Sequence, residues 1–364
     1  MKIDIVDMDN LRNPFWAAGQ ARATFEVSRI LAKHHTVTVH CSKYPGYSDY
    51  VQDGVSYVHH GVVVNQPQIT NAAFILSIPF IVSRIHSDVI IENFNAPFSV
   101  SFSPLFTKIP VIALPTMFNA EAFSRKYFLP FWIVEAIGMK FYRYMMPFST
   151  VGETKAKKLN RNIITKIIPE GVGPDFFAVK PGKSEYILFL GRFDIAQKGI
   201  DLLLKAYARI KEKINYPLVV AGHGSDKKKI EDLIQSLGLT GAVQLHGAVY
   251  GKDKMDLISR ALFVAFPSRH DEMSIWALEA LAAGLPLVGF DIPECEWAPN
   301  SVALKAEAYN VPVYADSLLR AAELNVNKKM RHAAREFARS FTWEHVASEI
   351  EAFIIEVIKH HGQK

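Results

Sequence analysis

Short apolar runs alternate with helical patterns along most of the chain. Lys2–Val6 predicts a buried strand, a polar loop follows it, and residues 21–33 carry apolar side chains at helical spacing. Residues 36–40 predict a second strand. Strand, loop, helix and strand in this order open a doubly wound α/β domain with a parallel sheet. The apolar runs 89–91 and 111–114 predict two further short parallel strands.

A second α/β series begins after turn-forming residues at 170–175 and 181–183, where we place the domain linker. Strands and helices alternate from there, which predicts a second parallel sheet with helices on both faces. The predicted strands are 186–190, 218–221, 243–245, 262–265 and 286–288, and the predicted helices are 201–211, 227–237, 252–260 and 275–283. Ligands of such sheets bind at the carboxyl ends of the strands, so the loops after these strands are the candidate site.

The loop after the strand at 186–190 carries two cations. Gly191 and Arg192 follow the strand end, and Lys198 precedes the next helix. Together they can meet a diphosphate at two points, because Arg offers a planar fork and Lys a point charge.

Glycines follow the next two strands. Gly222 allows a ligand to approach the backbone closely, although such a turn is also common without any ligand. Backbone groups near Gly247 and Val249 could contact the edge of a nucleobase, or form a simple β-to-α loop.

The loop before the helix at 275–283 has the most specific pattern. Ser274 predicts a helix N-cap, and the N–H groups just after it would favour an anion such as phosphate. Glu279 lies roughly 7–8 Å further along the helix axis, where a carboxylate can accept hydrogen bonds from sugar or ribose hydroxyls. Asp271, before the cap, could bind the hydroxyls of a transferred hexose.

The net charge is concentrated in the first half of the chain. Residues 1–180 carry 18 Lys and Arg against 13 Asp and Glu, while the remainder is balanced. This surplus would attract an anionic lipid or an acidic acceptor, or it is an ordinary solvated surface. No nucleic-acid-binding motif accompanies it, so we expect no nucleic-acid partner.

Residues 123–148 are aromatic, basic and rich in Met. They predict a helix that lies on a membrane surface, lines an apolar acceptor groove, or packs against the sheet. The longest apolar stretch, 72–82, is broken by Pro79 and is too short to span a bilayer. Cys41 and Cys295 are the only cysteines, lie far apart in sequence and have no metal-ligand spacing, so neither a disulfide framework nor a zinc site is expected. A reducing cytoplasm fits this, so we expect a cytoplasmic protein, with peripheral contact to the membrane through 123–148 as one option.

These motifs resemble glycosyltransferase family 4, whose members are retaining enzymes with the GT-B fold. The resemblance is good over roughly 165–290 and 338–356 and faint over 1–160. It is carried by the loop 191–199, the acid–seven residues–Glu spacing of Asp271 and Glu279, and the runs 278–286, 167–172 and 341–344.

The GT-B resemblance implies an α/β protein with two doubly wound, Rossmann-like domains facing a central cleft. Residues 1–170 would form the acceptor-side domain and residues 171–340 the domain that binds a nucleotide sugar. Residues 341–364 would form a C-terminal helix that crosses back to the N-terminal domain.

The resemblance also implies roles for the site residues. Arg192 and Lys198 would bind the donor diphosphate and stabilise the leaving group, Asp271 would hold the donor sugar, and Glu279 would bind the ribose. These first three residues are our catalytic candidates, and no metal or permanently bound cofactor is expected. The donor-binding candidates are Gly19, Gly191, Arg192, Lys198, Gly222, Gly247, Val249, Asp271, Met273, Ser274, Ile275 and Glu279.

Several positions depart from the family pattern. Asp271 stands where the family usually has Glu, residues 272–274 replace its Gly-Phe-Gly, and residues 18–19 are Ala-Gly rather than paired glycines. Thr116 stands where a His is often found, and with Glu92 it is a candidate acceptor-side residue. Asp7-Met8-Asp9 matches the Asp-x-Asp metal motif of the other large glycosyltransferase fold, but we interpret it as an ordinary loop without metal.

The predicted reaction moves a hexose from a UDP- or GDP-sugar to a hydroxyl of a glycan, a lipid-linked acceptor or a small molecule. Two alternatives remain open: a nucleotide-sugar epimerase or hydrolase on the same fold, and a non-catalytic two-domain sugar-binding protein.

Overall fold

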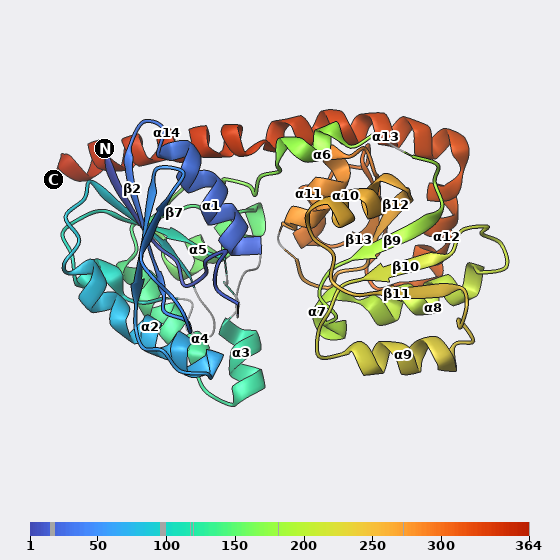
Figure 1. The fold of residues 1–364 in the computed structure, drawn as a ribbon, viewed down its shortest axis with the longest axis horizontal. Helices are drawn as coiled ribbons and strands as arrows, with labels where there is room; N and C mark the ends of the chain where they lie inside the picture. The colour runs from blue at the N-terminus through green and yellow to red at the C-terminus, as the bar shows by residue number, and fades with distance from the viewer. Residues whose placement is uncertain are drawn as a thin grey trace. The chain divides into compact units, whose positions relative to one another are not determined.

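The computed structural model of the protein (Figure 1) describes residues 1–14, 19–94, 100–116, 118, 120–180, 182–271 and 273–363. The chain divides into two compact units. Unit 1 comprises Met1–Pro169 together with Trp343–Lys364, and unit 2 comprises Glu170–Thr342. Each unit contains its own largely parallel sheet with helices packed against it.

Unit 1 has an eight-stranded sheet in the order β3-β4-β2-β1-β5-β6-β7-β8. The strands are β1 (Lys2–Val6), β2 (Thr36–Ser42), β3 (Tyr50–Gln52), β4 (Val55–His60), β5 (Val89–Asn93), β6 (Val111–Leu114), β7 (Tyr144–Met145) and β8 (Ile164–Thr165). All neighbours are parallel except β3 and β4. The central strand β1 lies between β2 and β5, and its Ile3 pairs with both Val37 and Val89.

The helices of unit 1 are α1 (Gly19–Leu31), α2 (Pro67–Val82), η1 (Ser103–Leu105), α3 (Ala120–Tyr127), α4 (Phe131–Gly138), η2 (Met139–Phe141), α5 (Thr150–Leu159) and α14 (Trp343–Gly362). The inner side of α2 packs against the sheet through Phe74, Ile78, Ile81 and Val82. The last helix, α14, contacts α1, and His35 Nε2 lies 2.8 Å from Glu351 Oε1 of α14, within hydrogen-bonding distance.

Unit 2 has a six-stranded, all-parallel sheet in the order β11-β10-β9-β12-β13-β14. Its strands are β9 (Tyr186–Leu190), β10 (Leu218–Ala221), β11 (Val243–His246), β12 (Ala261–Phe266), β13 (Leu287–Asp291) and β14 (Ala303–Glu307). Its helices are α6 (Pro174–Ala178), α7 (Ile195–Lys198), α8 (Ile200–Ile210), α9 (Lys227–Ser236), α10 (Gly251–Ser259), α11 (Ile275–Ala282), η3 (Pro293–Cys295), α12 (Val311–Ala322), α13 (Leu324–Ala338) and η4 (Arg339–Phe341).

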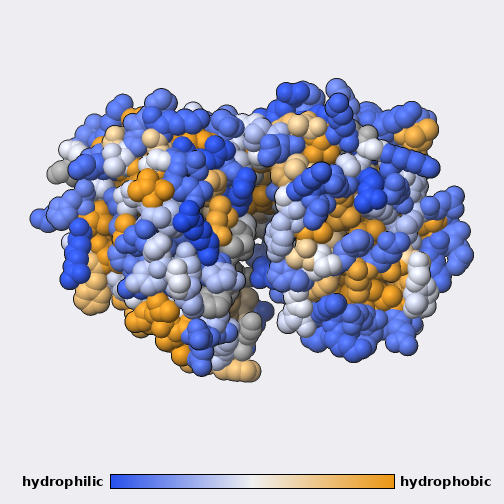
Figure 2. Space-filling model, in the orientation of Figure 1, coloured by the Kyte–Doolittle hydropathy of each residue, from blue (hydrophilic) through white to orange (hydrophobic). Residues whose placement is uncertain are grey.

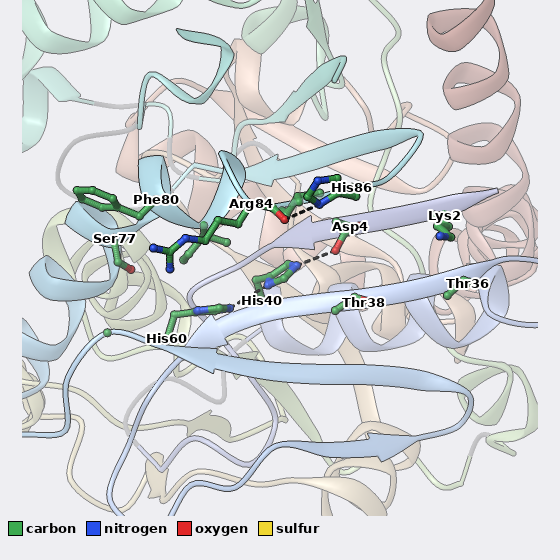
Figure 3. Close-up of a pocket in the computed structure, with 13 residues that line it drawn as sticks. Lys2, Asp4, Thr36, Thr38, His40, His60, Ser77, Phe80, Arg84 and His86 are labelled. Carbon is green, nitrogen blue, oxygen red and sulfur yellow. Dashed lines mark hydrogen bonds and ion pairs between the residues drawn. The ribbon is translucent and has the colours of Figure 1, made fainter. Parts of the chain in front are cut away.

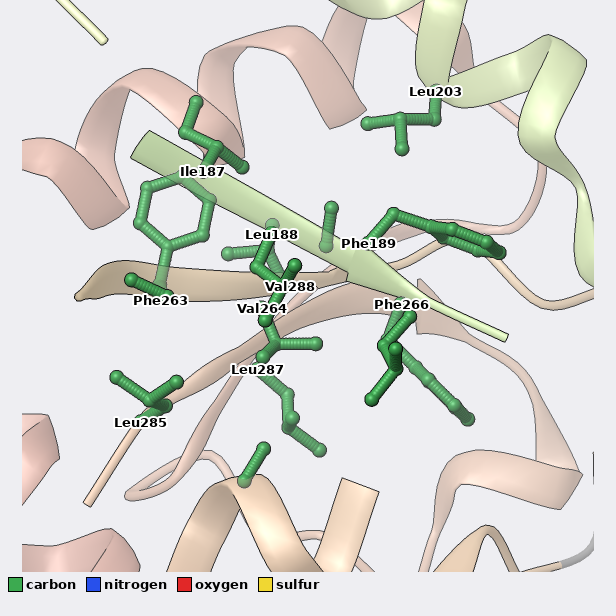
Figure 4. Packing of buried hydrophobic residues seen from close by; sticks show 14 of the residues in the cluster. Ile187, Leu188, Phe189, Leu203, Phe263, Val264, Phe266, Leu285, Leu287 and Val288 are labelled. Atoms are coloured by element: carbon green, nitrogen blue, oxygen red, sulfur yellow. The ribbon is translucent and has the colours of Figure 1, made fainter. Parts of the chain in front are cut away.

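The core of unit 2 fixes the strand ends that carry the candidate site. Every residue of β9 and β12 is buried, as expected for central parallel strands covered on both faces. Figure 4 shows Ile187 of β9 beside Phe263 of β12, and Phe189 of β9 near Phe266 of β12. This close packing gives the loops at the strand ends a rigid base.

The expected α/β fold class is confirmed, and one predicted element is wrong. Residues 123–148 do not form one helix: α3 ends at Tyr127, α4 begins after Pro130, and the segment finishes in the buried strand β7. Phe128 between the helices has a φ of 55°, and the ring of Pro130 cannot continue a helix from the preceding turn. Among the described residues, no helix is long and apolar enough to cross a membrane.

Candidate functional site

The strand-end loops of unit 2 lie side by side. Leu190 at the end of β9 pairs with Ala221 at the end of β10. Gly191 N–H donates to the Ala221 carbonyl at 3.0 Å, and Phe193 N–H donates to the His223 carbonyl at 2.7 Å. The first two candidate loops are therefore held together by backbone hydrogen bonds.

Glycines allow this close approach. A Cβ at Gly222 would lie 1.8 Å from the Gly191 carbonyl oxygen, and one at Gly199 would lie 2.0 Å from that of Pro267. Gly199 also has a φ of 64°, a left-handed conformation that costs side-chain-bearing residues free energy. Gly222 N–H donates to the Gly247 carbonyl at 3.2 Å, which joins the third loop to the first two. Val249 in that third loop packs against the core.

Lys198 and Asp271 meet in this site. Lys198 ends α7, which begins at its N-cap Asp194, and its side chain is 8% exposed. The ammonium forms an ion pair with Oδ2 of Asp271, and Ser268 Oγ donates to the same oxygen at 3.4 Å. Two residues that lie far apart in sequence, on loops predicted to hold one donor, are thus in contact.

Arg269 fastens the two loops to each other. Its backbone N–H donates to the Gln197 carbonyl at 2.8 Å, and its guanidinium holds both oxygens of Asp201 at 2.8 and 2.9 Å. Burial acts to raise the pKa of Asp201, but the Arg269 hydrogen bond and charge outweigh it, so that the pKa is lowered. This bridge was not predicted, because its partners are 68 positions apart in the chain.

Arg192, the second predicted cation, is exposed on the loop that follows β9. It forms no ion pair with any residue that the structure describes. The neighbouring Gly191 faces α11, because a Cβ there would lie 3.8 Å from the indole nitrogen of Trp276. The loop that bears Arg192 therefore adjoins the first turn of α11.

The start of α11 presents hydrogen-bond donors. Ser274 is the N-cap, as predicted, although its side chain makes no capping hydrogen bond. The indole N–H of Trp276 is buried and has no hydrogen-bond partner among the described residues, while its ring packs on Phe266. A buried donor without a partner is costly, so it is available to a ligand. Trp276 was missed by the sequence analysis, which attended only to charged and backbone groups.

Glu279 lies further along α11 and is buried beside a cation. Its carboxylate forms an ion pair with Lys254 of α10, whose ammonium also lies 5.5 Å from the ring centroid of Phe176. Lys254 was not predicted, since nothing in its local sequence distinguishes it from other surface lysines. The pair fixes the direction of the Glu279 carboxylate.

Met273 touches the segment that begins unit 2. Glu170 N–H donates to its sulfur at 3.4 Å. Burial raises the pKa of Glu170 to about 8. Glu272 and Ala18, which the motif comparison also involved, lie outside the described residues.

Of the predicted residues of unit 1, Glu92 is less exposed than expected. Gly19 begins α1. Glu92 is fully buried, accepts from the Tyr142 hydroxyl at 2.8 Å, and has a pKa raised by burial. That burial does not suit the direct acceptor contact expected of it. Thr116 Oγ1 donates to the Phe94 carbonyl at 2.7 Å.

Asp7 is more than the ordinary loop residue predicted. It is fully buried at the carboxyl end of β1, where it accepts from Thr24 Oγ1 at 2.5 Å and from Asp9 N–H at 3.0 Å. Burial raises the pKa of Asp7, and burial together with Asp7 raises that of Asp9 to about 8. No cluster of His, Cys, Asp and Glu among the described residues could hold a metal ion.

Unit 2 is similar in sequence to a known protein family. Residues 175–341 match the sequence model of the family described as glycosyl transferases group 1. The matched range lies within unit 2, which comprises Glu170–Thr342. The match confirms the glycosyltransferase resemblance on which the site residues were chosen, and the matched range contains both Lys198 and Asp271.

Curated relatives resemble parts of the chain. An uncharacterized glycosyltransferase from Methanocaldococcus jannaschii is 42% identical over 102 residues, which cover 28% of this chain and 26% of that protein. A phosphatidyl-myo-inositol mannosyltransferase from Mycobacterium tuberculosis is 30% identical over 220 residues, covering 54% of this chain and 55% of its own. The chain thus spans about a quarter and about half of the lengths of these two relatives.

Solved structures resemble the whole chain. Sucrose-phosphate synthase from Thermosynechococcus elongatus has a TM-score of 0.80 at 17% identity and covers 99% of both chains. Anabaena HepE in complex with UDP and glucose has a TM-score of 0.76 at 15% identity and covers 98% of this chain and 100% of its own. At these identities the likeness concerns the fold alone, and it confirms the GT-B fold class.

Proposed function

We propose that the protein is a retaining glycosyltransferase that moves a hexose from a UDP- or GDP-sugar to an acceptor hydroxyl. The observation that carries the proposal is the convergence of Lys198 and Asp271 beside the start of α11. A diphosphate would interact with Lys198, with Arg192 on the same loop and with the first N–H groups of α11. A mannosyltransferase among the relatives and a neighbour solved with UDP and glucose suit this class of donor.

In this proposal the cations act on the leaving group. Negative charge grows on the diphosphate as the glycosidic bond breaks, and Lys198 and Arg192 stabilise it without further reorganisation. Asp271, held by Lys198 and Ser268, accepts hydrogen bonds from hydroxyls of the hexose. Glu279, oriented by Lys254, accepts hydrogen bonds from the ribose. The two cations supply the charge for which other transferases use a metal ion.

Nucleotide sugars test the donor assignment directly. In a thermal-shift panel, a cognate UDP- or GDP-sugar at a hundred times its dissociation constant should add about 2.7 kcal/mol to the free energy of unfolding. Glu279→Gln should reduce the shift, because the amide no longer accepts with both oxygens and leaves Lys254 without its ion pair. Glu231→Gln, on the exposed pair with Lys227, is the matched control.

The outcomes of the panel separate the open alternatives. A shift by nucleotide sugars with turnover only when an acceptor is present agrees with the proposal. Turnover without acceptor would favour the epimerase or hydrolase, and a shift by free sugar alone would favour the binding protein. The configuration of the product, read by NMR, decides whether transfer is retaining.

We also propose that unit 1 works at the cytoplasmic face of a membrane. Figure 2 shows hydrophobic residues on the lower side of the left-hand unit, where Figure 1 draws α2 and α4. Phe128 is 92% exposed, which is unusual for an aromatic side chain in a water-soluble surface. The exposed large apolar side chains of α2, η1 and residues 128–141, which we call the apolar surface, are Leu76, Phe80, Leu105, Phe106, Phe128, Leu129, Trp132, Ile133, Ile137 and Phe141.

Vesicle binding tests the apolar surface. The double variant Phe128→Ser with Trp132→Ser should lose most co-sedimentation with anionic vesicles, because about 1.5–3 kcal/mol accompanies burial of each large apolar side chain. Val51→Ser, an equally apolar and 71% exposed position on β3, is the control. Equal sedimentation of all three proteins would refute membrane contact through this surface.

A further inference from the structure

A pocket of about 530 Å³ lies within unit 1, away from every candidate donor residue. It is formed by β1, β2 and β4 on one side and by α2 with the segment after it on the other (Figure 3). Its lining includes Lys2, Asp4, His40, His60 and Arg84. All of these residues belong to unit 1, so the pocket shares no lining residue with unit 2.

The sheet face beneath this pocket is polar where a covered parallel sheet is normally apolar. Lys2 and Asp4 alternate on β1 with the buried Ile3 and Ile5. Thr36, Thr38 and His40 alternate on β2 in the same way with buried valines. Because successive side chains of a strand point to opposite faces, the polar set faces the pocket together. Polar side chains between a sheet and a helix need hydrogen-bond partners, and the apolar helix α2 does not supply enough of them.

Two imidazoles and a carboxylate form a hydrogen-bonded row on this floor. His40 Nε2 lies 2.7 Å from Asp4 Oδ1, and His40 Nδ1 lies 2.9 Å from His60 Nε2. Figure 3 shows the row running from Asp4 through His40 to His60. In the arrangement in which His40 Nδ1–H donates to His60 Nε2, His60 carries its own proton on Nδ1, where it is a further donor.

The remaining charged groups of the pocket are cationic. Arg84 and Lys2 also line it, and Asp4 is the lone carboxylate of the lining. Asp4 is already engaged by His40, so the guanidinium of Arg84 and the ammonium of Lys2 line the cavity without a carboxylate from its lining. Burial and the neighbouring His40 lower the pKa of His60 to about 4, so His60 itself is uncharged near neutral pH.

An apolar wall completes the pocket. Phe80, Ile81 and Ile85 line the side formed by α2 and the residues after it. Phe80 is also a member of the exposed apolar surface, so the wall continues onto that surface. A ligand that suits this lining has an anionic head and an apolar remainder.

We propose that this pocket binds the phosphate group of a phosphomonoester, with Arg84 as its main ion-pair partner and His60 as a hydrogen-bond donor. The planar guanidinium of Arg84 can donate to two phosphate oxygens at once, and Lys2 adds a second positive charge. Asp4 holds His40 in the orientation that lets the imidazole row donate to the anion. The phosphate belongs either to a lipid headgroup or to a small phosphorylated metabolite, since both offer the same chemistry.

Calorimetric titration tests the site in the full chain. Glycerol 3-phosphate and inorganic phosphate are titrated into the Lys198→Gln protein, so that the unit 2 loops contribute less to the signal. Arg84→Gln and His60→Gln should each weaken binding about tenfold, because a charge-assisted hydrogen bond is lost. Lys33→Gln removes an exposed cation of unit 1 outside the pocket and should leave the affinity unchanged.

Vesicles distinguish the two sources of phosphate. If the ligand is a lipid headgroup, vesicles of phosphatidylcholine with phosphatidic acid should retain the wild type more than the Arg84→Gln protein, and pure phosphatidylcholine should not. If it is a free metabolite, glycerol 3-phosphate binds with the Arg84 dependence above and phosphatidic acid adds nothing. The proposal is overturned if neither the titration nor the vesicles respond to Arg84→Gln and His60→Gln. The donor assignment is untouched by that result, because it depends on unit 2.

Discussion

Replacing Lys198 by alanine is expected to lower kcat of sugar transfer by about a hundred- to a thousandfold, the loss seen when one preorganised charge-stabilising donor is removed. Lys198 is the buried cation of the site, and its ammonium is positioned by Asp271. Without it the departing diphosphate loses a fixed positive charge in a place that water reaches poorly. Steady-state kinetics with the donor identified by thermal shift measure the effect.

Two controls keep this result interpretable. Lys205→Ala removes a half-exposed lysine of the neighbouring helix α8, which pairs with Asp201, and should leave kcat unchanged. The double variant Lys198→Ala with Asp271→Asn removes the carboxylate left without its cation, so any loss of folding in the single variant should recover. Full transfer activity in a folded Lys198→Ala protein would contradict the role given to Lys198.

Gly222→Ala is expected to destabilise unit 2 by about 3 kcal/mol or more, the upper range for forcing atoms into a packed site. The new methyl carbon would lie 1.8 Å from the Gly191 carbonyl oxygen and 3.1 Å from the Phe193 ring. Relief requires the β9 and β10 loops to separate, which breaks the hydrogen bond between Gly191 and Ala221. Urea denaturation of the wild type and of the Gly222→Ala protein measures the change in the free energy of unfolding.

Gly247→Ala provides the comparison for the Gly222 variant. Gly247 is on the adjacent loop, but a Cβ there has no atom within 4 Å. Its stability should change by no more than about 0.5 kcal/mol, as for an unconstrained surface site. Equal stability of the two alanine variants would show that the loops at the ends of β9 and β10 do not touch as described.

The sequence predicted the central strands far better than the edges. The predicted ranges for β1, β6, β9 and β10 agree with the structure at both ends. These strands are short apolar runs between turn residues, a pattern that central parallel strands require. The strands β7 and β8 have two residues each, too few for a strand-length apolar run. They exist because neighbouring strands offer backbone partners, which local sequence does not record.

Some residues of the candidate site could be predicted from the sequence and others could not. Lys198 and Asp271 could be chosen because strand-end loops of a parallel sheet must converge. Lys254 and Arg269 could not, because their partners Glu279 and Asp201 lie on other helices and the pairing depends on how those helices pack. The exposure of Arg192 and the burial of Glu92 were likewise not readable from the order of residues.

The path of the chain has a consequence for its biosynthesis. Unit 1 is interrupted: α14 contacts α1, and Tyr144 OH bonds His360 at 2.8 Å, although the whole of unit 2 separates these segments in sequence. Unit 2 is uninterrupted and has all its residues once Thr342 has been translated. A ribosome therefore delivers a complete second unit before the first can acquire its final helix, which reverses the usual order in which domains mature on a nascent polypeptide.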